Sequence, residues 1–174
     1  MASLLKEKYL YERYSARLLA VCQRYLGSRS DAEDVLHDSF ITIFKKIDDA
    51  EYRGEGKLYA WMRTVTVHQC IDFIRRKNRA PGSLDERMDF VDDAGPEPEG
   101  VRKIPPEVLF RLIRELPEGY RTVFNLFSLD GYSHAEIAEM LGIKEKTSSS
   151  QYLRARRLLA QKINDYLAHD GKKQ

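Results

Sequence analysis

Apolar residues recur at three- and four-residue intervals along most of the chain, and this spacing predicts helices. The clearest example is the stretch DAEDVLHDSFITIFKKI, residues 31–47. On a helix its apolar residues form one stripe, whereas charged residues occupy the opposite side. The apolar stripe consists of Leu36, Phe40, Ile43, Phe44 and Ile47. No stretch alternates apolar and polar residues as a half-buried strand would, so we expect an all-α fold.

One proline-rich, acidic segment interrupts the helical pattern. All six prolines lie between residues 81 and 117, and residues 80–106 show no sustained helical period. We therefore expect two small helical domains, residues 1–79 and 107–170, joined by a flexible acidic linker, residues 80–106. The acidic residues either keep this linker soluble and extended, or lie in a basic channel as a mimic of nucleic acid.

The second domain contains a helix signal, a glycine turn and a further helix signal. Ser133 and Glu136 have the spacing of a capping box at the start of one helix. Gly142 is expected to end that helix in a left-handed conformation. A second helix follows Ile143. This order predicts a helix–turn–helix, whose second helix enters the major groove of DNA.

The expected second helix, within GIKEKTSSSQYLRARRLL (residues 142–159), begins with small polar residues and ends with arginines. Serine hydroxyls can contact base edges, and basic side chains can contact phosphates. The candidate DNA contacts are Lys146, Ser149, Ser150, Arg154, Arg156 and Arg157. The alternative is that the arginines form an ordinary solvated face. The capping box and the glycine turn before them favour the DNA interpretation.

The polar side of the helix expected at residues 31–47 carries Ile41 among charged residues, with Asp38 one turn and Asp34 two turns before it. A single exposed apolar residue needs no functional explanation. Its acidic neighbours also fit the centre of a small protein-docking patch. Both interpretations stay open from the residues alone.

The stretch EYRGEGKLYAWMRTVTVHQCIDFIRRKNR, residues 51–79, predicts a glycine-containing loop followed by a long helix. One stripe of this helix consists of Trp61, Thr64, His68, Asp72, Arg75 and Arg79. Aromatic and arginine planes stack on unpaired bases, at roughly 1–3 kcal/mol per base, and the basic cluster at residues 75–79 would hold the nucleic-acid backbone. Alternatively, Trp61 belongs to the core and Asp72 pairs with Arg75 or Arg76.

Composition narrows the class of protein further. The chain has 174 residues, a formal net charge of +2 and two cysteines, Cys22 and Cys70, without metal-binding spacing. We therefore expect no disulfide, metal site or cofactor. No apolar run approaches the roughly 18 residues that span a membrane, and the charged N-terminal segment does not fit a signal peptide. With no nucleophile–base pair or phosphate loop, we expect a cytoplasmic protein that is not an enzyme.

Three segments together resemble one family, the extracytoplasmic-function (ECF) group of sigma-70 factors, which are the minimal two-domain sigma factors of bacterial RNA polymerase. They are LYERYSARLLAVCQRYLGSRSDAEDVLHDSFITIFKKI, YRGEGKLYAWMRTVTVHQCIDFIRRKNR and LPEGYRTVFNLFSLDGYSHAEIAEMLGIKEKTSSSQYLRARRLL. They cover most of both expected domains, and their order and spacing fit the family. The first domain resembles sigma region 2, and the second resembles the region 4 helix–turn–helix.

The resemblance implies a role for each segment. Docking on the polymerase clamp is implied for Asp34, Val35, Asp38 and Ile41. Binding and opening of the −10 promoter element is implied for Tyr52, Arg53, Lys57, Trp61, His68, Arg75, Arg76 and Arg79. Thr147 and Gln151 join the residues above as contacts to the −35 element. The implied partners are core RNA polymerase, promoter DNA and, by family habit, an anti-sigma factor.

Three residues depart from the pattern of the family. His68 stands where the family commonly has Asn, and His37 stands where it commonly has Gln. Ser148 replaces an aliphatic residue in the second helix of the helix–turn–helix. That position should face the neighbouring helix, so the hydroxyl of Ser148 is expected to need a hydrogen-bond partner there.

Two other functions remain as alternatives from the sequence. One is a conventional helix–turn–helix regulator that binds duplex DNA without polymerase, usually as a dimer. The other is an adaptor whose helical domains bind only proteins. A sigma factor is expected to bind promoter DNA only when core polymerase is present. The regulator would bind duplex DNA alone, and the adaptor would bind no DNA in either case.

Overall fold

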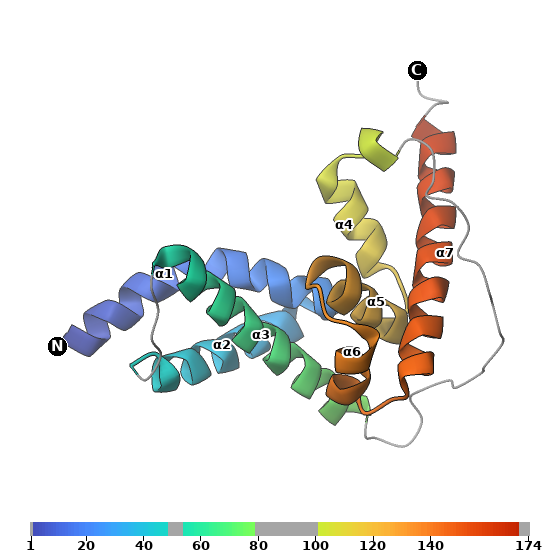
Figure 1. The fold of residues 1–174 in the computed structure, drawn as a ribbon. Coiled ribbons are helices and arrows are strands. Elements are labelled where there is room, and N and C mark those ends of the chain that lie inside the picture. Colours follow the sequence, from blue (N-terminus) through green and yellow to red (C-terminus); the bar gives the residue numbers. More distant parts are fainter. Residues whose placement is uncertain (1, 49–53, 79–100, 171–174) are drawn as a thin grey trace. The chain divides into compact units, whose positions relative to one another are not determined.

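The computed structural model describes residues 2–48, 54–78 and 101–170. The chain divides into two compact units, unit 1 (Met1–Gly82) and unit 2 (Ser83–Gln174). Every regular element in the described ranges is helical (Figure 1), so the expectation of an all-α fold is confirmed there. Residues 80–100 of the predicted linker lie outside the described residues, as do the predicted site residues Tyr52, Arg53 and Arg79.

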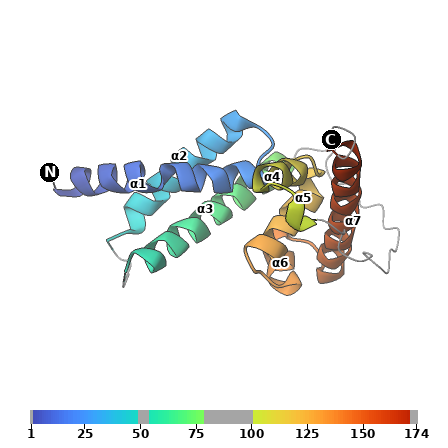
Figure 2. The ribbon, with the colours of Figure 1, turned by 90° about the horizontal axis from the view of Figure 1, so that it is seen from above.

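Unit 1 consists of three helices, α1 (Ala2–Tyr25), α2 (Arg29–Lys46) and α3 (Glu55–Asn78), and each packs against the other two (Figures 1 and 2). Its core contains the buried side chains of Leu10, Tyr14, Leu18, Cys22 and Tyr25 from α1, Val35, Leu36, Phe40 and Ile43 from α2, and Met62, Val67, Cys70, Ile71 and Ile74 from α3. This single shared core holds the outward faces of α2 and α3 in a fixed relation.

The predicted apolar stripe of α2 points into this core. Ile43 is fully buried, and Leu36, Phe40 and Ile47 are each at most 7% exposed. Phe40 also packs against Tyr11 of α1, with ring centres 4.8 Å apart. The helix begins after Ser28, whose hydroxyl accepts a hydrogen bond from the backbone N–H of Asp31. Such a cap satisfies a donor that the first turn would otherwise leave unpaired.

Unit 2 contains the short 3-10 helix η1 (Val101–Lys103), then α4 (Pro106–Arg114), α5 (Glu118–Phe124), the π-helix η2 (Asn125–Leu129), α6 (His134–Leu141) and α7 (Glu145–Asp170). Helices α4, α5 and α6 all pack against α7, the longest helix of the unit (Figure 1). A buried cluster from α4, α7 and the turns that follow η1 and α4 consists of Ile104, Leu112, Ile113, Leu116, Ala155, Leu159 and Ile163.

The C-terminal end of the expected linker differs from the sequence analysis. Residues 101–103 form η1, and Ile104 is only 7% exposed within the core of unit 2. Pro105 and Pro106 then start α4, because proline suits the first positions of a helix, where its missing N–H costs nothing. Residues 101–106 therefore belong to the helical unit, and the proline pair marks a helix start.

The segment after α5 also differs from the simple helix that its periodicity predicts. The backbone N–H of Asp130 donates to the carbonyl of Asn125, five residues earlier, which is the hydrogen bond of a π-helix. The element ends at Leu129. Gly131 follows it with a φ of 79°, a conformation that favours glycine. The extra residue in this turn changes which side chains face α6 and α7.

Candidate nucleic-acid and protein interfaces

The outward side of α2 presents the acidic stripe that the sequence predicts. Asp34 and Asp38 are exposed, and Ile41 is 40% exposed. We call these three residues the α2 stripe. Val35 is different, because its side chain is only 1% exposed and belongs to the core. The implied contact between Val35 and polymerase is therefore corrected, since a side chain enclosed by its own helices cannot touch a partner.

The backbone beneath the α2 stripe is connected to α3 by hydrogen bonds. Gln69 of α3 donates from Nε2 to Oγ1 of Thr42 at 3.1 Å. The Thr42 hydroxyl in turn donates to the backbone carbonyl of Asp38 at 3.0 Å. Half-buried hydrogen bonds between side chains restrict sliding of one helix along another more than apolar contacts alone do. The α2 stripe and α3 therefore form one rigid surface.

Helix α3 carries a polar and basic face opposite its core. Its buried residues include Met62, Thr66 and Cys70, which follow one another at helical spacing. On the other side, Lys57 and His68 are exposed, and Trp61 and Arg75 are half-buried. We call Lys57, Trp61, His68, Arg75 and Arg76 the α3 face. The structure thus brings every described residue of the predicted −10 set onto one helix.

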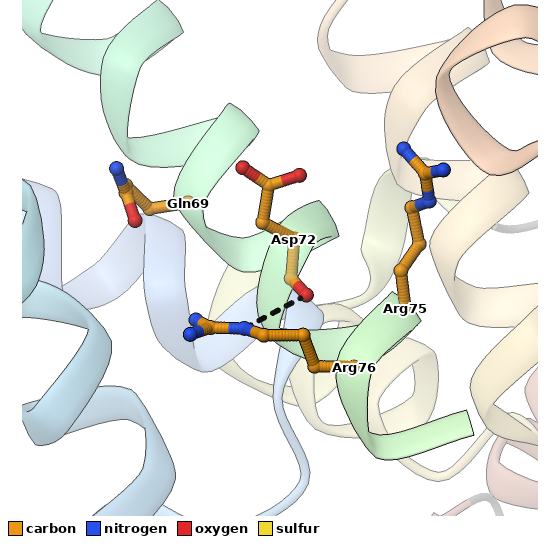
Figure 3. A pocket seen from close by; sticks show the side chains of 4 residues that line it. All are labelled: Gln69, Asp72, Arg75 and Arg76. Carbon is orange, nitrogen blue, oxygen red and sulfur yellow. Dashed lines mark hydrogen bonds between the residues drawn. The ribbon is translucent and has the colours of Figure 1, made fainter. Parts of the chain in front are cut away.

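A polar hollow of about 290 Å³ lies at the C-terminal half of α3, lined by Gln69, Asp72, Arg75 and Arg76 (Figure 3). Nε of Arg76 donates to the backbone carbonyl of Asp72 at 3.3 Å, so this arginine contacts the main chain and not the Asp72 carboxylate. Arg75 points away from Arg76 (Figure 3). Two guanidinium groups thus reach the surface on either side of the Asp72 carboxylate.

The helix–turn–helix of unit 2 has the features that the sequence predicts. The Ser133 hydroxyl accepts from the backbone N–H of Glu136 at 3.2 Å, and the Glu136 carboxylate accepts from the N–H of Ser133 at 2.8 Å. The backbone N–H and the hydroxyl of Ser133 both donate to the Glu136 carboxylate, and these two hydrogen bonds lower the pKa of Glu136. Gly142 ends α6 with φ 68° and ψ 34°. The N–H of Ile143 bonds to the carbonyl of Ala138, so the helix end forms a Schellman turn.

The outward side of α7 carries part of the predicted −35 set. At helical spacing, one stripe contains Lys146, Ser150, Leu153 and Arg157. Lys146 and Arg157 are exposed, and Ser149 and Ser150 are half-buried. Ser150 donates its hydroxyl proton to the carbonyl of Lys146 at 2.8 Å. Because a serine oxygen keeps lone pairs when its proton is engaged, Ser150 can still accept a hydrogen bond from a base edge.

Other predicted −35 residues lie toward the flanks of α7. Nη1 of Arg154 donates to the hydroxyl of Tyr120 at 3.3 Å. The Gln151 side chain lies beside Gly119 at the start of α5. A Cβ atom added to Gly119 would stand 3.7 Å from Oε1 of Gln151. Thr147 and Arg156 are half-buried. The eight predicted contacts therefore do not share one face, because they extend over more than half of the helix circumference.

The expected partner of Ser148 is present. Ser148 is fully buried, and its hydroxyl lies 2.9 Å from Nδ1 of His134, the first residue of α6. Burial lowers the pKa of His134, and the nearby carboxylate of Glu145 opposes this shift only partly. His134 is not among the residues predicted from the sequence. Its place one residue after the capping serine was the signal that could have found it.

Two negative findings concern the described ranges, residues 2–48, 54–78 and 101–170. No group of three or more His, Cys, Asp or Glu residues there could hold a metal ion. None of the helices in these ranges has the length and apolar character needed to cross a membrane.

Two models of protein families match the chain, one on each unit. The family described as "Sigma-70 region 2" matches residues 10–80, and the family described as "Sigma-70, region 4" matches residues 107–159. The first range includes the α2 stripe and α3, and the second includes the helix–turn–helix.

Curated relatives match over most of the chain. It is 30% identical over 166 residues to the ECF RNA polymerase sigma-E factor of Salmonella typhimurium, covering 88% of this chain and 84% of that protein. It is 29% identical over 164 residues to the ECF RNA polymerase sigma-E factor of Haemophilus influenzae, covering 88% and 85%.

A solved structure shares the fold. It is the sigma factor RpoE from Bartonella quintana in complex with the anti-sigma factor NepR, with a TM-score of 0.52, 20% identity, and coverage of 90% of this chain and 96% of that one. Both sigma regions thus occur in their usual order, one on each unit, and the chain belongs to the ECF group of the sigma-70 family.

Proposed function

We propose that this sigma factor binds core RNA polymerase, recognises the −10 element with unit 1 and the −35 element with unit 2, and promotes strand opening. The observation that carries this proposal is the occurrence of both sigma-70 regions in one chain, on two separate units. Membership of the family makes the chain a polymerase-associated initiation factor rather than a helix–turn–helix regulator that acts alone.

The α2 stripe is the proposed docking site for polymerase. Ile41 supplies an exposed apolar side chain, and Asp34 and Asp38 supply negative charge beside it. An apolar centre with a charged rim is the usual anatomy of a specific protein interface. Steering by the carboxylates would accelerate association with a basic partner surface.

The α3 face is the proposed site for the −10 element. Trp61 can stack on an unpaired base, and His68 offers a ring nitrogen to a base edge or phosphate. Flipping a base out of the duplex costs a few kcal/mol, and stacking of each unpaired base returns roughly 1–3 kcal/mol. The cationic groups of Lys57, Arg75 and Arg76 would hold the backbone. Tyr52, Arg53 and Arg79 remain proposed members of this site.

The N-terminal half of α7 is the proposed reader of the −35 element. Lys146, Ser149 and Ser150 are the residues that we expect in the major groove, and Arg157 lies further along the same side. Thr147, Gln151, Arg154 and Arg156 remain candidates on the flanks, for contacts to the sugar–phosphate backbone on either side of the groove. A single small module of this kind binds weakly alone. Attachment of both units to polymerase makes the second DNA contact effectively intramolecular.

The remaining parts of the proposal follow from the partner. Core polymerase supplies the chemistry of RNA synthesis, so we assign no catalytic step, cofactor or metal to this chain. We place the protein in the cytoplasm, where core polymerase works. Residues 80–100 are proposed to form a flexible acidic linker. An anti-sigma factor is a further proposed partner, and RpoE, the sigma factor with the similar fold, was solved with one.

A gel-shift assay with and without core polymerase tests the proposal. The chain should form a promoter-specific complex only when core polymerase is present. Tight specific binding of duplex DNA by the chain alone would identify a conventional regulator. Absence of DNA binding under both conditions would identify an adaptor that binds only proteins.

A further inference from the structure

A cluster of aromatic and polar side chains connects α6, α7 and the π-helix on the inner side of α7, away from Lys146 and Ser150. It consists of Phe127, Ser128, His134, Ser148 and Tyr152, and we call it the α6–α7 joint. Neither sigma-region match assigns these residues a role. In this joint a serine of α7 and a histidine of α6 meet at a helix–helix contact, where aliphatic residues are the ordinary choice.

The imidazole of His134 is held on its face and at its edge. The ring of Phe127 stacks on it with centres 4.3 Å apart and planes within 10° of parallel. At the edge, Nδ1 and the Ser148 hydroxyl are 2.9 Å apart. A stacking contact fixes the plane of a ring, and a hydrogen bond fixes its rotation within that plane. His134 therefore presents a directional contact to α7.

The second contact of the joint lies one turn further along α7. The hydroxyl of Tyr152 accepts a hydrogen bond from Ser128 at 3.1 Å. Its ring centre lies 4.5 Å from that of Phe127. Both partners, Phe127 and Ser128, belong to the π-helix, whose additional residue sets which side chains face α7. Two directional contacts one turn apart restrict both rotation and sliding of α7.

The positions on α7 connect the joint to the proposed DNA contacts. Ser148 lies between Lys146 and Ser150 in the sequence, and consecutive residues point about 100° apart around a helix. A rotation of α7 that lengthens the bond between Ser148 and His134 therefore rotates Lys146 and Ser150 in the groove by the same angle. Sequence reading by hydrogen bonds tolerates little change of angle.

We propose that Ser148 and His134, with Tyr152, are positioning residues that set the rotation of α7 and thereby the base preference of this chain at the −35 element. They touch one another and not the DNA. This inference rests on the proposed function of unit 2, and it adds a determinant of sequence preference. An aliphatic residue at position 148 would pack against α6 over a range of rotations of α7, whereas the hydrogen bond to His134 selects one rotation.

The test measures base preference with the full chain bound to core polymerase. A promoter is first selected from a library with a randomised −35 region by the wild-type holoenzyme, and each −35 base pair is then changed in turn. Single-round transcription gives the ratio of the selected promoter to each altered one. The variants are Ser148→Ala, which removes the hydroxyl, His134→Phe, which keeps a stacking ring without Nδ1, and the double variant.

Each single variant should reduce the selectivity ratio about three- to tenfold, the factor that loss of one net hydrogen bond represents. The double variant should lose no more than either single variant, because both remove the same bond. Tyr152→Phe, which removes only the hydroxyl, should change selectivity in the same direction. Affinity for core polymerase should stay unchanged in all four.

A matched control separates positioning from stability. Thr122 is buried in α5, and its hydroxyl donates to the carbonyl of Glu118 in the same helix at 2.7 Å. Thr122→Val also removes a buried hydroxyl from unit 2, and it should retain wild-type selectivity even if the melting temperature falls. Assays run below the melting temperature of every variant, measured by circular dichroism.

Three results would overturn the inference. They are wild-type selectivity in Ser148→Ala and His134→Phe, losses that multiply in the double variant, and an equal loss of selectivity in Thr122→Val. Failure of the proposed function would appear differently, because the wild-type chain would then select no −35 sequence with core polymerase.

Discussion

The guanidinium group of Arg17 lies over the ring of Tyr59, with its Cζ 3.7 Å from the ring centre. One turn earlier on both helices, Nη2 of Arg13 forms an ion pair with Oε2 of Glu55 at 2.7 Å. Arg13 and Arg17 are four residues apart on α1, as are Glu55 and Tyr59 on α3. These two pairs join α1 to the first two turns of α3, on the side away from the α3 face.

Removal of the cation–π contact should loosen the start of α3. We expect Arg17→Ala and Tyr59→Leu each to destabilise unit 1, with a coupling energy of about 0.5–1 kcal/mol between them in a double-mutant cycle. Denaturant unfolding of the full chain, followed by the fluorescence of Trp61, measures it. Lys8→Ala, at an exposed position of the same helix, is the control and should change stability little. A coupling energy of zero would show that the stacked geometry contributes nothing to stability.

Reversal of charge on the α2 stripe should weaken binding to polymerase. Asp38→Arg replaces an exposed carboxylate with a cation, and we expect at least a tenfold loss of affinity for core polymerase, about 1.4 kcal/mol. The helix itself should remain intact, because Thr42 bonds to the carbonyl of Asp38 and not to its side chain. Fluorescence titration of labelled chain with core polymerase gives the affinity.

The matched control for Asp38→Arg is Glu12→Arg, an equal change of charge on an exposed position of α1. It should leave polymerase affinity unchanged. Val35→Ala should behave differently from both, because Val35 is a core residue, and it should lower stability by about 2 kcal/mol through loss of buried apolar volume. Equal losses of affinity in Asp38→Arg and Glu12→Arg would mean that net charge, and not the α2 stripe, governs docking.

Replacement of Lys146 should weaken unit 2 on DNA without affecting polymerase. We expect replacement of both Lys146 and Arg154 by Ala to abolish transcription from promoters that depend on the −35 element, and Lys146→Ala alone to reduce it. If Lys146 contacts one phosphate, the slope of log affinity against log salt should fall by about one. Filter binding of the holoenzyme to promoter DNA over a salt series measures the slope. A parallel loss of affinity for core polymerase would contradict the assignment of α7 to DNA.

Unit 2 should become less stable as pH falls below neutrality. Burial lowers the folded-state pKa of His134, whereas the unfolded chain titrates near the ordinary value of about 6.5. Below that value the unfolded state binds a proton that the folded state does not, so the free energy of unfolding decreases. The stabilisation of unit 2 that His134 provides is complete above about pH 6.5, and it is lost as pH falls toward the folded-state pKa of His134.

Scanning calorimetry of the full chain at pH 7.5 and 5.5 measures this effect. The transition of unit 2 should move to lower temperature at pH 5.5 in the wild type, and the shift should be smaller in His134→Phe. Thr122→Val, which removes a buried hydroxyl of unit 2, is the control and should show the same shift as the wild type. An equal shift in the wild type and His134→Phe would show that other groups cause it.

Local signals made much of the fold predictable. Three features depend on residues within one or two turns of each other, and the local sequence is therefore enough to predict them. They are the apolar stripe of α2, the capping box of α6 and the left-handed conformation of Gly142. The burial of Ser148 followed from its place on the inner side of α7. In each case the residue type and its spacing were enough, because the physical effect acts over a few ångströms along one helix.

The features that the sequence did not predict depend on contacts between distant segments. A π-helix differs from an α-helix by one residue per turn, and apolar spacing cannot distinguish the two over five residues. Ile104 follows a proline-rich stretch, and only its burial against α4 and α7 shows that it is a core residue. Val35 lies beside the outward residues of α2 in the sequence, but its own position turns toward the core.

A footprint of the open complex tests the central claim most directly. The full chain, core polymerase and a selected promoter are combined, and DNase protection and permanganate reactivity of unpaired thymines are recorded on both strands. Protection over the −35 element together with unpaired thymines in the −10 element, both only when chain and polymerase are present, is the expected result. Protection of neither element, or the same footprint from the chain without polymerase, would contradict the account.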